Sequence, residues 1–121
     1  TRWVVETLGP DVPMHFTAFH PDYKMRDRPP TPPETLTKAR EIALANGARY
    51  VYTGNVHDSD GGSTYCPGCR GLVIGRDWYE LGAWNLDEHG GCRNCGTPIP
   101  GHFDTKPGRF GAQRIPVRLA M

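Results

Sequence analysis

Four cysteines are the residues of this chain whose type and spacing most clearly predict chemistry. They form two Cys-x-x-Cys pairs with 22 residues between them, and the sequence contains no other cysteine. Each pair is expected to form a tight turn, here called a knuckle, that presents two thiolates to one metal ion. The first knuckle is residues 66–71 and the second is residues 92–97. The predicted metal ligands are Cys66, Cys69, Cys92 and Cys95.

Zinc is the metal that this pattern favours, because tetrahedral sites made of four thiolates suit Zn²⁺; iron is the main competitor. Four protein ligands leave no open coordination position, so the predicted role of the metal is structural. Two disulfides, or four free buried cysteines, are the alternatives. Disulfides are less favoured because the residues from Thr1 onward do not resemble a secretory signal, and we therefore expect a cytoplasmic location.

Composition narrows the class of protein. The chain of 121 residues carries a formal net charge of +1, so a general polyanion such as nucleic acid is not indicated as a partner. Its 15 glycines and 12 prolines predict many turns. No apolar run approaches the roughly 20 residues of a membrane span, so no membrane association is expected.

The first half of the chain shows a strand-helix-strand pattern. Residues 1–8 resemble the end of a helix, which suggests that the chain is part of a longer one, and residues 12–20 resemble a strand. A helix is predicted from an N-cap at Thr31 to about residue 46, and a second strand over 49–53. Strands joined by such a helix are usually parallel neighbours, which predicts an α/β sheet or barrel.

The second half reads as a zinc ribbon. A polar linker over residues 58–63 should lead into the first knuckle, and residues 71–76 and 78–86 should form the arms of a hairpin. We expect three aromatic side chains to form the small core of the ribbon, with an aromatic docking face as the alternative. These side chains are Trp78, Tyr79 and Trp84.

Three regions result from this division: an α/β part over residues 1–56, the ribbon over 57–103 and a tail over 104–121. Basic and apolar residues are interspersed along the tail. A strand at the end of the chain is the favoured interpretation, and an arm that binds nucleic acid is the alternative.

Polar residues at the ends of the two predicted strands form a second candidate site. Ligands of parallel α/β proteins bind at the carboxyl ends of the strands, so side chains that follow both strands should meet at one rim. The alternative is that these are ordinary hydrogen-bonded loop residues or a surface ion pair. The candidate cofactor-binding residues are His20, Asp22, Lys24, Asn55 and His57.

Several segments together carry a family resemblance. The first of these segments is residues 9–25, which contain the run His-Phe-Thr-Ala-Phe-His-Pro at 15–21. The others are residues 31–39, residues 50–56 and the Cys-Pro-Gly-Cys of the first knuckle. These segments resemble the late-barrel part of the AmmeMemoRadiSam-system radical S-adenosylmethionine (SAM) enzymes, which are related to pyruvate formate-lyase activating enzyme. The resemblance extends to about residue 103 and implies the last strand-helix-strand elements of a radical SAM partial barrel, followed by the ribbon.

The resemblance implies an enzyme whose full-length form is longer than this chain. Family members hold a [4Fe–4S] cluster on an upstream Cys-x3-Cys-x2-Cys motif and cleave SAM to a 5′-deoxyadenosyl radical. That motif is not in this sequence. In related activating enzymes a histidine matching His20 contacts SAM. The implied partners are the upstream part of the same barrel and the two other proteins of the system.

No catalytic residue and no substrate follow from these residues. The second interpretation is a non-catalytic zinc-ribbon module that binds protein or nucleic acid. One detail departs from the common pattern of such knuckles, in which glycine directly follows the second cysteine. Gly96 satisfies it, but Arg70 occupies the equivalent place in the first knuckle, so we expect either a looser first turn or a role for Arg70 in offsetting thiolate charge.

Overall fold

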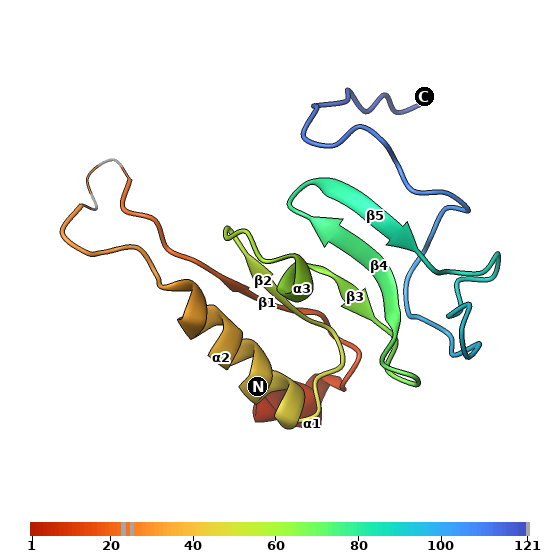
Figure 1. Cartoon of the computed structure of the whole chain (residues 1–121), viewed down its shortest axis with the longest axis horizontal. Helices are drawn as coiled ribbons and strands as arrows, with labels where there is room; N and C mark the ends of the chain where they lie inside the picture. The colour runs from red at the N-terminus through yellow and green to blue at the C-terminus, as the bar shows by residue number, and fades with distance from the viewer. Residues whose placement is uncertain (23, 25, 121) are drawn as a thin grey trace.

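The computed structural model of the chain describes residues 1–22, 24 and 26–120. It contains a parallel two-stranded sheet and an antiparallel three-stranded sheet (Figure 1). The elements in chain order are α1 (Arg2–Leu8), β1 (Met14–Thr17), α2 (Pro33–Ala45), β2 (Val51–Gly54), α3 (Ser59–Gly62), β3 (Thr64–Tyr65), β4 (Leu72–Asp77) and β5 (Glu80–Trp84). A mixed α/β fold is therefore confirmed.

Strands β1 and β2 are parallel neighbours, as the strand-helix-strand pattern predicts. The small apolar cluster behind them is built around Ala43, Ala48 and Val51, with Val5, Met14 and Phe16 packed against it. Because side chains alternate along a strand, the residue between Met14 and Phe16 points to the opposite face, where His15 stacks on Tyr52. The helices thus cover one face of the pair and leave the other face to polar and aromatic side chains.

The start of α2 differs from the prediction. The N-cap residue is Pro32, one residue later than expected, so Thr31 as N-cap is wrong. The Thr31 hydroxyl instead accepts a hydrogen bond of 2.9 Å from the Phe19 N–H, and the Thr31 N–H donates to the Phe19 carbonyl. The threonine therefore ties the loop before α2 to the chain that leaves β1. The predicted stop at Gly47 is confirmed by its φ of +97°.

The predicted polar linker is also wrong, because residues 59–62 form the short helix α3. The Asp58 carboxylate caps this helix by accepting from the Gly61 N–H at 2.9 Å. Its second oxygen accepts from the Thr53 hydroxyl, also at 2.9 Å, and so joins α3 to β2. The ribbon therefore begins in direct contact with the parallel sheet.

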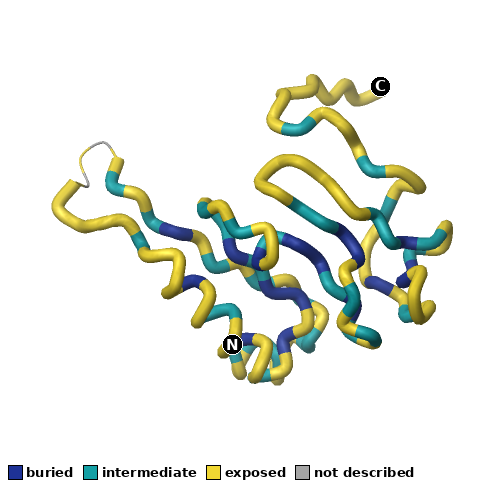
Figure 2. Tube along the Cα trace, viewed as in Figure 1, coloured by how far each residue is buried: buried dark blue, intermediate teal, exposed yellow. Residues whose placement is uncertain are grey.

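The predicted hairpin is confirmed as β4 and β5, and β3 adds a third strand. Its core is not the one expected, since Trp78 and Tyr79 are 46% and 61% exposed at the hairpin turn. Of the three aromatic residues, Trp84 alone packs against the core, and it is only partly buried. The buried side chains belong instead to the following residues (Figure 2): Tyr50, Cys66, Val73, Ile74, Leu86, Cys92 and Ile99.

The tail forms no strand over residues 104–120, so the favoured interpretation of a chain-end strand is wrong for these residues. Ile115, Val117 and Leu119 are all exposed, and Figure 1 shows the tail passing over the hairpin of β4 and β5 without joining their sheet. Among the described residues, no helix is long and apolar enough to cross a membrane.

Candidate metal centre

The four cysteines converge on one point although two of them lie far apart in sequence from the others. Their sulfur atoms all lie within 4.8 Å of one another, with 3.5 Å between Cys66 and Cys95 and 3.7 Å between Cys69 and Cys92. None of the four is in a disulfide. A tetrahedral zinc ion with Zn–S bonds of about 2.3 Å requires sulfur separations of about 3.8 Å. The cluster could therefore hold a metal ion such as zinc.

Both knuckles have the same backbone hydrogen bonds. In the first, the Cys66 carbonyl accepts from the Arg70 N–H at 2.8 Å, and the Cys66 N–H donates to the Gly71 carbonyl at 2.9 Å. In the second knuckle, the equivalent residues make the same two bonds at 2.7 and 2.9 Å. The first turn is thus as tightly closed as the second, and the expectation of a looser turn is wrong.

The closure depends on a left-handed residue directly after each Cys-x-x-Cys pair. Gly96 has a φ of +79°, which glycine adopts at little cost. Arg70 has a φ of +62° at the equivalent position, although it carries a Cβ. The proposed electrostatic role of the exposed Arg70 side chain stays a prediction.

Polar groups surround the sulfur atoms. The Gly68 N–H donates to the Cys66 sulfur at 3.3 Å, and the Thr97 hydroxyl lies 3.1 Å from the Cys95 sulfur. A Cβ on Gly68 would collide with the hydroxyl of Thr97, so glycine allows the two knuckles to approach each other. Sequence reasoning missed Thr97, although its place two residues after a predicted ligand was a usable signal.

These contacts favour the thiolate form at two positions. The Thr97 side chain and backbone N–H lower the pKa of Cys95 to about 6. The Asn94 side chain and then the Gly71 N–H lower the pKa of Cys69. Metal binding requires deprotonated sulfur, so this arrangement prepares these two cysteines for a cation.

Burial distinguishes the sulfur ligands further. Cys66 and Cys92 are 1% and 2% exposed and lie in the ribbon core with Val73 and Leu86, whereas Cys95 is exposed. The candidate centre is therefore part of the core on one side and close to solvent on the other.

Two of the five candidate rim residues come together. The His20 Nε2 donates to the Asn55 carbonyl at 2.9 Å, and the Asn55 side-chain amide donates to the Ala18 carbonyl at 3.1 Å. Asn55 has a φ of +59°, which asparagine tolerates better than most residues. These bonds join the chain segments that leave the carboxyl ends of β1 and β2.

The other candidates lie in different surroundings. His57 stacks on Trp78 with 4.8 Å between ring centres, and its Nδ1 is 3.8 Å from a carboxylate oxygen of Asp77. Asp22 and Lys24 are exposed on the loop after β1. A role of all five residues in binding a cofactor stays a prediction.

The chain is similar to an uncharacterized protein of Methanocaldococcus jannaschii, with 48% identity over 99 residues. The matched region covers 81% of this chain but only 30% of the relative, so the chain spans less than a third of that curated protein. No protein-family model matches the chain, and no solved structure matches it significantly. The similarity therefore shows a longer relative and assigns no activity.

Proposed function

We propose that the chain is the C-terminal portion of a radical SAM enzyme and that its four-cysteine cluster is a structural zinc site. The observation that carries the metal assignment is the set of four sulfur atoms within 4.8 Å of one another. Four thiolates complete the coordination of one zinc ion, so the ion has a structural and not a catalytic role. Free thiols of this kind persist in a reducing compartment, which agrees with a cytoplasmic location.

The enzyme assignment rests on the family resemblance of residues 9–56. It is supported by the β1–α2–β2 unit, in which the two strands are parallel, because (β/α) barrels are built from repeats of this unit. His20 and Asn55 lie at the carboxyl ends of these strands, where parallel sheets bind ligands. These two residues would contact SAM, whose bound form supplies the radical. The chain's part would be to position the cofactor from this rim.

The cysteines of this chain do not fit the [4Fe–4S] cluster of such enzymes. A cube of four irons separates its thiolate ligands more widely than a single ion does, whereas the sulfur atoms here surround one small space. In the proposed enzyme, a preceding part of the protein would therefore hold the cluster. The relative, of which this chain matches 30%, is long enough to contain one.

Metal analysis of the purified full chain tests the zinc assignment. We expect one zinc per chain and a colourless sample. An iron-loaded, coloured protein with charge-transfer bands would instead indicate a rubredoxin-like electron carrier, and a metal-free folded chain would contradict any metal site.

The enzyme assignment requires the longer polypeptide that contains these residues. After anaerobic reconstitution with iron and sulfide, we expect reductant-dependent conversion of SAM to 5′-deoxyadenosine. His20→Ala should weaken SAM binding, whereas His89→Ala, at an exposed ribbon turn, should not. A longer chain with no Cys-x3-Cys-x2-Cys motif and no cluster signal would overturn the assignment.

A second candidate is a non-catalytic ribbon that binds protein or nucleic acid. The exposed Trp78 and Tyr79 at the hairpin turn favour it, because exposed aromatic residues often mark contact surfaces. Under the enzyme assignment, the two other proteins of the AmmeMemoRadiSam system are the proposed partners. Co-purification of all three proteins, tested against a Trp78→Gly variant, would show whether the hairpin contributes to their contact.

A further inference from the structure

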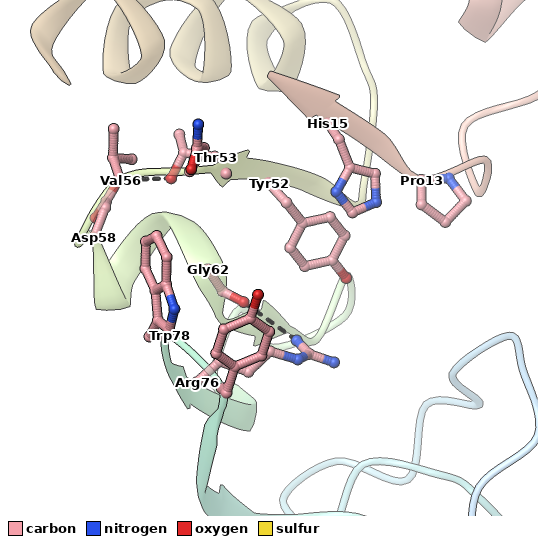
Figure 3. A pocket seen from close by; sticks show the side chains of 12 residues that line it. Pro13, His15, Tyr52, Thr53, Val56, Asp58, Gly62, Arg76 and Trp78 are labelled. Carbon is pink, nitrogen blue, oxygen red and sulfur yellow. Dashed lines mark hydrogen bonds between the residues drawn. The ribbon is translucent and has the colours of Figure 1, made fainter. Parts of the chain in front are cut away.

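A cavity of about 710 Å³ lies between the parallel sheet and the ribbon, away from the metal centre. Figure 3 shows the side chains that line it: His15 and Tyr52 come from the sheet, and Trp78 and Arg76 come from the hairpin. The volume is in the range of small-molecule pockets in proteins. Of the residues assigned a role above, Asn55, Trp78 and Tyr79 also line this cavity, whereas His15, Tyr52 and Arg76 have no assigned role.

Aromatic rings form its walls. Tyr52 lines the cavity and stacks on His15 with 5.0 Å between ring centres and an angle of 24° between the planes. On the hairpin side, Trp78 stacks on His57, and Tyr79 packs edge-on against Trp78 with their ring centres 5.8 Å apart. Rings held in this way offer flat surfaces to a planar ligand at little cost in side-chain entropy.

Trp78 has a backbone conformation that is unfavourable for a residue of its size. Trp78 and Tyr79 are the two residues between β4 and β5, and Trp78 has a φ of +57°. Glycine is the favoured residue at the first position of such a turn when φ is positive there. A bulky side chain in the left-handed region costs roughly 1–2 kcal/mol. Because Trp78 is also 46% exposed, burial in the core does not offset this cost.

Arg76 supplies a fixed positive charge at the same cavity. Its Nη1 donates to the Thr64 hydroxyl at 2.7 Å and to the Gly62 carbonyl at 3.3 Å, and its guanidinium carbon lies 5.7 Å from the centre of the Tyr52 ring. Among the described residues, these side-chain hydrogen bonds use Nη1 and leave the other guanidinium donors for a ligand.

The acidic residue of the cavity is already engaged. Both oxygens of the Asp58 carboxylate accept hydrogen bonds within the chain, one from Gly61 and one from Thr53. It therefore holds α3 in place and is a weaker partner for a cationic ligand than Arg76 is for an anion. The His15 imidazole also lines the cavity and can donate a hydrogen bond to an anion, whereas His57 lies 3.8 Å from the Asp77 carboxylate.

We propose that this cavity binds a planar aromatic molecule that carries an acidic group. The ring of the ligand stacks on the aromatic walls, and its carboxylate or phosphate pairs with the Arg76 guanidinium. The assignment does not depend on radical chemistry, because it follows from the walls and charges of the cavity alone.

Calorimetric titration of the zinc-loaded full chain tests the proposal with three probes. They are 2-naphthoate, its uncharged analogue 2-naphthalenemethanol, and the non-aromatic anion cyclohexanecarboxylate. We expect saturable binding of one naphthoate per chain and at least about tenfold weaker binding of the other two. The indole N–H signal of Trp78 in ¹H–¹⁵N spectra should shift on addition of naphthoate.

Trp78→Gly separates a ligand role from a structural one. Glycine suits the positive φ, so the melting temperature should stay the same or rise, while naphthoate binding falls about tenfold. Trp3→Ala is the matched control, because Trp3 is an exposed tryptophan on α1, outside the cavity. Arg76→Lys keeps the charge but loses the fork geometry, and it should weaken binding about threefold.

Three outcomes would overturn the proposal. Equal affinity of naphthoate for the Trp78→Gly variant and for the unchanged chain would show that the Trp78 ring does not contact the ligand. Equal affinity for 2-naphthalenemethanol and 2-naphthoate would show that the acidic group of the ligand does not contribute to binding. The absence of saturable naphthoate binding would exclude a ligand site of this kind in the cavity.

Discussion

The two knuckles are closed by the same backbone hydrogen bonds, but the residue that follows the Cys-x-x-Cys pair differs between them. Arg70, with a φ of +62°, occupies the place that Gly96, with a φ of +79°, has in the second knuckle. Placing a residue with a Cβ in this conformation costs about 1 kcal/mol relative to glycine. The first knuckle therefore bears strain that the second avoids.

The surroundings of the knuckles explain why both turns nevertheless form. Cys66 directly follows β3, and β4 begins directly after the first knuckle, so the three-stranded sheet fixes both ends of that turn. The second knuckle is held by an isolated bridge between Leu86 and Cys92 and by another between Gly91 and Pro98. Strain is tolerated where the surrounding structure imposes the conformation, and glycine is used where it does not.

Loss of a metal ligand should remove the difference between the knuckles by unfolding both. Cys92→Ser, or chelation of the metal, is expected to unfold residues 62–103, because metal binding supplies much of the folding free energy of such small modules. Hydrogen exchange should increase there and much less around Ala43, which lies in the separate cluster behind the parallel sheet. Unchanged exchange in residues 62–103 after metal removal would contradict a structural metal.

Gly96→Arg copies the first knuckle into the second and tests the role of the surroundings. The second turn has no strand on either side to impose the positive φ. The strain of placing a residue with a Cβ there should therefore lower the free energy of unfolding by about 1–2 kcal/mol. Urea denaturation of the zinc-loaded protein measures this loss. An unchanged midpoint would mean that the metal alone imposes the turn.

The reverse change, Arg70→Gly, should release strain from the first knuckle. We expect a gain of about 0.5–1 kcal/mol, smaller than the loss at Gly96 because glycine also adds freedom to the unfolded chain. The same denaturation experiment applies. A loss of stability would instead show that the Arg70 side chain itself contributes, as expected if it offsets thiolate charge.

Local spacing made much of this structure predictable. The distance between the cysteine pairs predicted their convergence, and the helix between two strands predicted the parallel pair. The helix α3 was missed because Gly61 and Gly62 have low helix propensity. Gly61 is nevertheless needed there, since a Cβ would collide with the side chains of Asp58 and Thr53.

The aromatic residues show a different limit of sequence reasoning. Large apolar side chains are usually buried, which predicts a core position for Trp78 and Tyr79, but these residues form the turn between β4 and β5 and are exposed. Tyr50 was missed for the converse reason. It precedes β2 in the first half of the chain yet packs in the ribbon core, a contact between distant segments that local patterns do not encode.

The smallest expected effect concerns the pH at which the four-cysteine site releases its metal. The Thr97 hydroxyl and N–H hold the pKa of Cys95 at about 6, below the ordinary thiol value of 9.0. In this range the folded state binds fewer protons than the unfolded state, so the stabilisation is complete above about pH 9 and is lost as the pH falls through 6. Thr97→Val removes the hydroxyl, raises the pKa of Cys95 and should move zinc release to higher pH. Release followed with a chromogenic chelator measures the shift, and Thr37→Val, on the exposed face of α2, is the matched control. An identical release curve for the two variants would show that the Thr97 hydroxyl does not stabilise the thiolate.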